Sequence, residues 1–140
     1  MFPALCAALD CVPSQTQKQS LASAMVVFQG TVVEIKTIEE DHVDLVIFET
    51  SRVWKGPPHK SVEVVAFRYR SQGDGYTFHA GAEYIVYATA EYPRELRKNW
   101  PELQRLAPEA TVYSLPNCVP RVRSDINEEL KLLGARWRKP

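Results

Sequence analysis

The sequence predicts a mainly β fold, in which five strands close into a barrel with small flanking helices. Blocks of β-branched and aromatic residues, bounded by Gly or Pro, are typical of short strands. A chain of 140 residues with 45% hydrophobic content suits one domain, because two halves of about 70 residues would each bury too small a core. Gly30 stands inside the first block, where a missing side chain is typical of a bulge or sharp bend in a closed barrel.

The N-terminal part is expected to contain one helix and two long strands. Pro13-Ser14 suits a helix start, and apolar residues gather toward Ala24. The first strand follows over Met25–Ile35. A charged turn at residues 39–41 leads to the second strand, Val43–Trp54, which ends at Lys55-Gly56-Pro57-Pro58 because proline has no amide donor for a strand ladder.

Shorter strands are expected in the middle of the chain. Val62–Tyr69 forms the third strand, with apolar residues alternating on both faces. Gln72-Gly73-Asp74-Gly75 is a turn, since Asp-Gly readily adopts positive φ angles. Two short strands follow, Tyr76–His79 and Glu83–Thr89, and Thr111–Leu115 adds an edge strand.

Helical structure is expected in two places near the C-terminal end. Between Arg94 and Leu106, Pro101 interrupts the helix formers, so we expect two short turns with Trp100 as an apolar plug. A helix begins at Asp125-Ile126-Asn127-Glu128, which has capping-box spacing, and ends at Gly134. Ile126, Leu130 and Leu133 lie along one face of this helix. Meandering strands with an interior glycine and small helices favour an OB-like barrel over a sandwich.

The charge distribution disfavours nucleic acid as a partner. The 17 basic and 17 acidic side chains leave no net field that would concentrate phosphates around the molecule. Residues 1–93 nevertheless carry a net charge of −4 and residues 94–140 a net charge of +4. The basic segment is either a solvated helix surface or a docking face for an acidic partner.

The order of the predicted strands and their motifs resembles the netrin-like module of tissue inhibitors of metalloproteinases, in its bacterial form. The likeness runs from about Cys11 to Gly134, and its pieces are Val53-Trp54-Lys55-Gly56, Gly75-Tyr76, Phe78, Gly81, Tyr84-Ile85-Val86-Tyr87-Ala88 and Cys118. The resemblance implies an N-terminal arm over residues 1–12 and a single netrin-like domain over residues 13–140. It also implies a secreted or periplasmic, non-enzymatic protein-binding module without a cofactor, whose partner is a protein such as a metalloprotease.

The resemblance further implies a disulfide between Cys11 and Cys118. Such a bond closes a loop of about a hundred residues, which the chain-entropy model values at roughly 4–5 kcal/mol. The second bridge of the family is absent, because Leu9 and Asp74 occupy its two positions. Cys6 is then unmatched, and three states stay open for it: a free thiol, an intermolecular bridge that makes a homodimer, or a competing bond to Cys118.

Two segments are the expected partner contacts. They are the arm residues Leu9, Asp10, Cys11 and Val12, and the turn residues Asp74, Gly75 and Tyr76. In the inhibitors, the first cysteine chelates the protease zinc through its α-amino nitrogen and carbonyl oxygen. That wedge is not matched here, since ten residues precede Cys11 and Leu9 stands in place of the first cysteine.

Other chemistry receives little support from the sequence. No Gly-x-Ser-x-Gly, Walker loop, His-Glu-x-x-His or Cys-x-x-Cys occurs, so we expect no enzyme. His42, His59 and His79 are widely separated, which predicts no metal site. Asp74 and Glu83 are ordinary turn and strand residues rather than an acid–base pair.

The first residues of the chain indicate an exported protein, and two alternative functions stay open. Met1–Asp10 is apolar without a basic leader, so we expect that an export signal has been removed; no run of about 18 apolar residues predicts a membrane span. One alternative is an envelope or self-association module without inhibitory activity. The other is an OB-type binder of single-stranded nucleic acid, using Phe67-Arg68-Tyr69-Arg70 and Trp54-Lys55.

Intact mass spectrometry checks the cysteine prediction. With a Cys11–Cys118 bond, alkylation before reduction modifies one thiol or, in a disulfide-linked dimer, none, and alkylation after reduction modifies all three. A monomer with three reactive thiols before reduction would contradict the bond.

Overall fold

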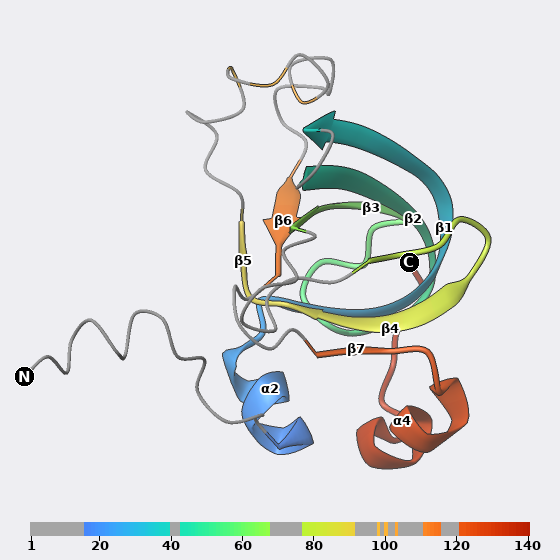
Figure 1. The fold of residues 1–140 in the computed structure, drawn as a ribbon. Coiled ribbons are helices and arrows are strands. Elements are labelled where there is room, and N and C mark those ends of the chain that lie inside the picture. The colour runs from blue at the N-terminus through green and yellow to red at the C-terminus, as the bar shows by residue number, and fades with distance from the viewer. Residues whose placement is uncertain are drawn as a thin grey trace, which may run out of the picture.

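A single strongly curled sheet dominates the computed structural model (Figure 1). The structure describes residues 16–39, 43–67, 77–91, 98, 100, 103, 111–115 and 121–140. Within these residues the sheet has seven strands in the order β5-β6-β3-β2-β1-β4-β7. The strands are β1 (Val26–Glu39), β2 (Val43–Lys55), β3 (Ser61–Phe67), β4 (Glu83–Ala88), β5 (Ala90–Glu91), β6 (Val112–Ser114) and β7 (Arg121–Arg123). Two helices, α2 (Gln17–Ser23) and α4 (Ile126–Leu133), lie together beside β4 and β7.

The mainly β fold with small flanking helices is confirmed, but the closed barrel of five strands is wrong. The sheet is a curled half-barrel, and its strand order ends at β5 on one side and β7 on the other. Only Thr89 separates β4 from β5 along the chain. In this stretch, β4 pairs with β1 and β5 pairs with β6. The sequence pattern gave no sign of β7, which adds a further strand to β4.

The first three strands form the expected antiparallel meander, and two later predictions need correction. Residues 77–79 are not in a strand; Phe78 instead buries its ring in the core. Thr111–Leu115 contains β6, but this strand is not at an edge. It pairs in parallel with β3 and antiparallel with β5, a non-local arrangement that the local pattern of a short segment does not encode.

The inside of the curl is packed with aromatic rings. Phe48 stands between Phe28 and Phe78, with ring centroids 5.1 and 5.3 Å apart, and Phe78 meets Tyr84 at 5.0 Å. The Phe78–Tyr84 contact is edge-on, like the other two. Edge-to-face pairs of this kind contribute about 0.5–1.5 kcal/mol each beyond the burial of their area. This row of rings holds β1, β2 and β4 in one core.

The alternation predicted for the third strand is confirmed over its described part. Val62, Val64 and Ala66 belong to the aromatic core, whereas Val65 faces a second cluster that Trp100 packs against. The side chain of Trp100 is half-buried there, as an apolar plug would be.

The two helices cover the outer face of β1 and β4. Val27, Ile85 and Tyr87 are buried there, against Leu21 of α2 and the apolar face of α4. That face is formed by Ile126, Leu130 and Leu133, as predicted. The helix begins after Asp125, whose side chain accepts a hydrogen bond from the Glu128 amide, and ends at Gly134. The first helix begins after Thr16, which forms a capping box with Gln19.

Gly30 lies at a bend, as its place in the sequence predicted. The pairing of β1 with β2 shifts register between Gln29 and Gly30. A Cβ at Gly30 would lie 3.0 Å from the Glu49 carbonyl oxygen and 3.2 Å from the Cβ of Phe48. The missing side chain therefore lets the two strands approach closely where the sheet curls.

Gly56 offers a test of close packing at the end of β2. Its φ is 87°, and a Cβ there would lie 2.9 Å from the Met25 carbonyl oxygen, whereas Gly81 has a φ of 84° and open space around it. We expect Gly81→Ala to lower the free energy of unfolding by about 1 kcal/mol, from backbone strain alone. Gly56→Ala should lower it by at least about 1 kcal/mol more, because a clash adds to the strain. Urea denaturation measures both, and equal losses would contradict the close contact.

Candidate functional site

The residues that the sequence predicted as functional lie outside the described residues. They are Cys6, Leu9, Asp10, Cys11, Val12, Asp74, Gly75, Tyr76 and Cys118. His42 and residues 68–70 also lie outside them. The disulfide, the state of Cys6 and the two expected contact segments therefore stay predictions.

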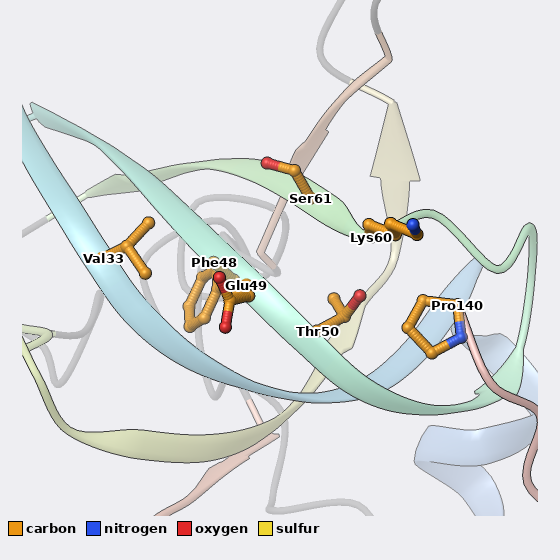
Figure 2. Close-up of a pocket in the computed structure, with 7 residues that line it drawn as sticks. All are labelled: Val33, Phe48, Glu49, Thr50, Lys60, Ser61 and Pro140. Atoms are coloured by element: carbon orange, nitrogen blue, oxygen red, sulfur yellow. The ribbon is translucent and has the colours of Figure 1, made fainter.

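The candidate site in the described residues is a groove where β3 parts from β2. The two strands pair from Val43 to Glu49 of β2, and the Thr50 amide still donates to the Lys60 carbonyl oxygen at 2.9 Å. The Thr50 hydroxyl donates to the His59 carbonyl oxygen, and the loop that contains Pro57-Pro58 then leads away. A groove of about 450 Å³ lies at this fork, lined by Val33, Phe48, Glu49, Thr50, Lys60, Ser61 and Pro140 (Figure 2). We call it the fork groove.

A β-bulge places an apolar side chain in the fork groove. Val32 pairs with Phe48 and Glu34 pairs with Ile47, which leaves Val33 as the extra residue of β1. Val32 is buried, so Val33 at this bulge points away from the core, and the residue is 55% exposed. Val33 and Pro140 line opposite ends of the groove, with Phe48, Glu49 and Thr50 between them (Figure 2).

Polar groups stand at the rim of the fork groove. Glu49, Lys60 and Ser61 are exposed, and none of their side chains forms a hydrogen bond or ion pair with another described residue. A carboxylate, an ammonium group and a hydroxyl are thus free to bind a ligand beside these apolar residues. A few polar groups on a largely apolar surface are typical of binding sites.

Pro140 belongs to the C-terminal segment, residues 134–140, which we call the tail. Val53 of β2 and Arg138 exchange two backbone hydrogen bonds, at 3.0 and 2.8 Å. The Arg52 guanidinium carbon lies 4.9 Å from the ring centroid of Trp137, and the Arg138 guanidinium donates to the Gly56 carbonyl oxygen. The tail therefore occupies the side of β2 that β3 has left.

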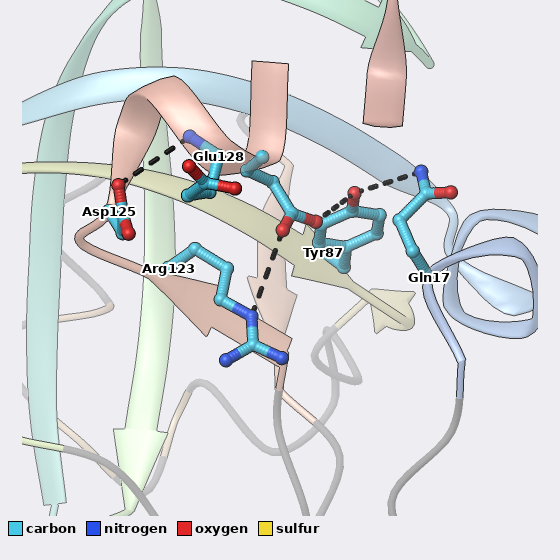
Figure 3. A network of polar contacts seen from close by, with 6 residues as sticks. Gln17, Tyr87, Arg123, Asp125 and Glu128 are labelled. Atoms are coloured by element: carbon cyan, nitrogen blue, oxygen red, sulfur yellow. Dashed lines mark hydrogen bonds and ion pairs between the residues drawn. The ribbon is translucent and has the colours of Figure 1, made fainter. Parts of the chain in front are cut away.

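A buried polar network lies under the helices (Figure 3). The Tyr87 hydroxyl donates to the Glu129 carboxylate at 2.6 Å and accepts from the Gln17 side-chain amide at 3.1 Å. The Arg123 guanidinium lies 3.8 Å from the other carboxylate oxygen. Glu129 is only 3% exposed, so it needs these partners to offset its desolvation. The network ties α2, β4, β7 and α4 together.

Sequence reasoning missed Glu129, although its spacing carried a signal. It stands three residues after Ile126 and four before Leu133, which places it on the apolar face of the helix. A charged residue at such a position needs a buried partner, and the hydroxyl of Tyr87 is that partner.

The motif Val53-Trp54-Lys55-Gly56 has packing roles in the structure. Val53 belongs to the aromatic core. The Trp54 ring packs against the outer hydrophobic cluster of Ala24, Val27, Ile85 and Tyr87, and its indole N–H donates to the Gly134 carbonyl oxygen at 3.0 Å. The Lys55 ammonium donates to the carbonyl oxygens of Leu21 and Ala22, at 2.8 and 3.0 Å, and so caps the end of α2. The contacts of Val53, Trp54 and Lys55 therefore stabilise the fold and indicate no ligand.

The remaining candidates for chemistry are separate from one another. His59 and His79 are both exposed, and the described residues contain no group of three metal-ligating side chains. The Glu83 carboxylate accepts a hydrogen bond from the Gln29 side chain at 2.9 Å. No helix in the described part of the chain is long and apolar enough to cross a membrane.

Removing one hydroxyl tests the buried network. We expect Tyr87→Phe to lower the free energy of unfolding by about 1–3 kcal/mol, because the buried Glu129 carboxylate loses the hydrogen bond from the Tyr87 hydroxyl. The matched control is Glu128→Gln on the same helix, whose side chain is 66% exposed and should matter by less than about 0.5 kcal/mol. Urea denaturation compares the two, and a Tyr87→Phe protein as stable as the control would contradict the network's role.

Comparison with known proteins adds no relative. A scan against models of protein families found no match, and a search of curated proteins found none either. The resemblance to the netrin-like module therefore stays a prediction.

Proposed function

We propose that this chain is a non-enzymatic protein-binding module that acts outside the cytoplasm, and that the fork groove contacts its partner. The observation that carries the proposal is the groove itself. An exposed valine and a proline lie beside a carboxylate, an ammonium group and a hydroxyl that have no partner among the described residues.

The shape of the site favours a protein segment as the ligand. The fork groove lies between β1, β2 and β3, and the elements around it are held by the aromatic core and by the backbone bonds of the meander. A pre-formed groove of this kind loses little conformational entropy on binding. Glu49 and Lys60 offer one charge of each sign, which suits a peptide backbone with mixed side chains better than a phosphate chain.

The resemblance to metalloproteinase inhibitors supports a protease as the partner class. The family's zinc-chelating residues are not matched here, so inhibition through the fork groove would be steric and would not require a bond to the metal. An envelope protein or a second copy of the chain is the alternative partner under the same proposal.

Binding of single-stranded nucleic acid has weaker support. That function needs outward-facing aromatic rings beside basic residues. The ring of Trp54 is instead packed against the outer hydrophobic cluster, and its N–H is bonded to the tail.

Titration against a panel of zinc proteases tests the proposal. We expect reduced activity of at least one protease at micromolar protein, and a loss of about tenfold or more in that effect with Glu49→Lys, because a positive charge replaces the carboxylate that the partner contacts. The control is Leu132→Asn on α4, an exposed apolar residue outside the groove, which should leave the effect unchanged. Inhibition that Glu49→Lys does not weaken would exclude the groove, and no effect on any protease would remove the inhibitor role.

A further inference from the structure

Among the described residues, no strand of the sheet pairs with one side of β2 beyond Thr50. On its other side β2 pairs with β1 as far as Lys55, but its pairing with β3 ends at Glu49. A strand edge exposes N–H and C=O groups that can pair with any extended chain. In this structure the tail pairs with that edge at Val53.

Residues 137 and 138 of the tail are recognised at three points. The Arg138 backbone pairs with Val53, the Trp137 ring lies against the Arg52 guanidinium, and the Arg138 guanidinium donates to the Gly56 carbonyl oxygen. Backbone pairing gives affinity for any extended chain, while the ring and the guanidinium select a sequence. The edge of β2 therefore selects a segment with an aromatic residue followed by an arginine.

The tail is also weakly held. It makes one backbone bridge to the sheet, and three of its side chains, Arg136, Arg138 and Lys139, are exposed. Gly134, the first residue of the tail, has a φ of 77°, and its carbonyl oxygen accepts the Trp54 indole N–H, so a conformational change of the tail begins after this residue. Segments with few buried apolar contacts open at low free-energy cost.

We infer that the free edge of β2 is a strand-addition site for an extended partner segment with an aromatic residue followed by arginine, and that the tail competes for it. Release of the tail removes Pro140 from the fork groove as well, so partner binding at the edge opens the groove. The inference rests on the proposed function for its partner. The test below uses only the tail's own sequence, so it can fail separately from that proposal.

Because the tail is attached to the chain, it competes with a free peptide for the β2 edge at a fixed effective concentration. A short linker gives the tail an effective concentration on the order of 1 mM at the edge. If the same sequence binds as a free peptide with a Kd of about 100 μM, the attached tail weakens its binding roughly tenfold.

The experiment uses the full chain and a fluorescein-labelled peptide with the sequence of residues 134–140. The double variant Trp137→Ala, Arg138→Pro releases the tail, since it removes the ring and the N–H that Arg138 donates to Val53. Fluorescence anisotropy should show that the peptide binds this variant about tenfold more tightly than the unaltered chain. Adding Arg52→Ala should weaken binding several-fold, through loss of the cation–ring contact, whereas adding Lys131→Ala on α4 should not.

Hydrogen exchange on the same proteins provides a second measurement. The Val53 amide donates to the Arg138 carbonyl oxygen, so its exchange should accelerate at least tenfold in the double variant, while the Val46 amide in the middle of β2 stays protected. Circular dichroism and the protection of Val46 report that the variant is folded. The inference is overturned if the folded variant binds no peptide, if it binds no tighter than the unaltered chain, or if Val53 exchange does not change. If Glu49→Lys did not weaken protease inhibition, the proposed function would be contradicted, but the peptide-binding and exchange results would be unaffected.

Discussion

The structure depends on one constraint, which is that β1 must pair with two strands at once. It bonds β2 over nearly its whole length and β4 over its first six residues. A flat strand cannot keep both partners around a core of large rings, so the ladder shifts register at four places and the sheet curls. The curl brings Phe28, Phe48 and Tyr84 into one core and leaves the outer face of β1 and β4 for the helices.

The functional candidate follows from the same constraint. A bulge is the means by which β1 bends, and the bulge at Val33 also exposes an apolar side chain. The curl separates β3 from the second half of β2, which leaves a fork for the groove and a free edge for the tail. The bend of β1 and the fork groove therefore have the same origin. Functional sites are often found beside β-bulges.

Local pattern was sufficient for much of the fold. The alternation in Val62–Ala66 and the helical spacing of Ile126, Leu130 and Leu133 are short-range signals, and both gave the correct buried face. The parallel pairing of β6, the strand β7 and the burial of Glu129 depend on partners far away in the chain. The fork groove was not predictable for the same reason, since β1, the start of β3 and Pro140 meet only through the tertiary fold. The sequence instead indicated the cysteines and two contact segments, which lie outside the described residues.

The last residues of β2 join distant parts of the chain. Lys55 bonds the end of α2, 33 and 34 residues earlier, and Trp54 bonds Gly134, 80 residues later. Contacts between such remote segments slow the search for the native state, because a large loop must close before they form. During synthesis on the ribosome, the Trp54 indole would therefore lack its packing partners Ile85 and Tyr87 until β4 emerges, and its hydrogen-bond acceptor until residue 134 emerges. A nascent chain in that state is a natural substrate for chaperones, which shield apolar surface until folding is complete.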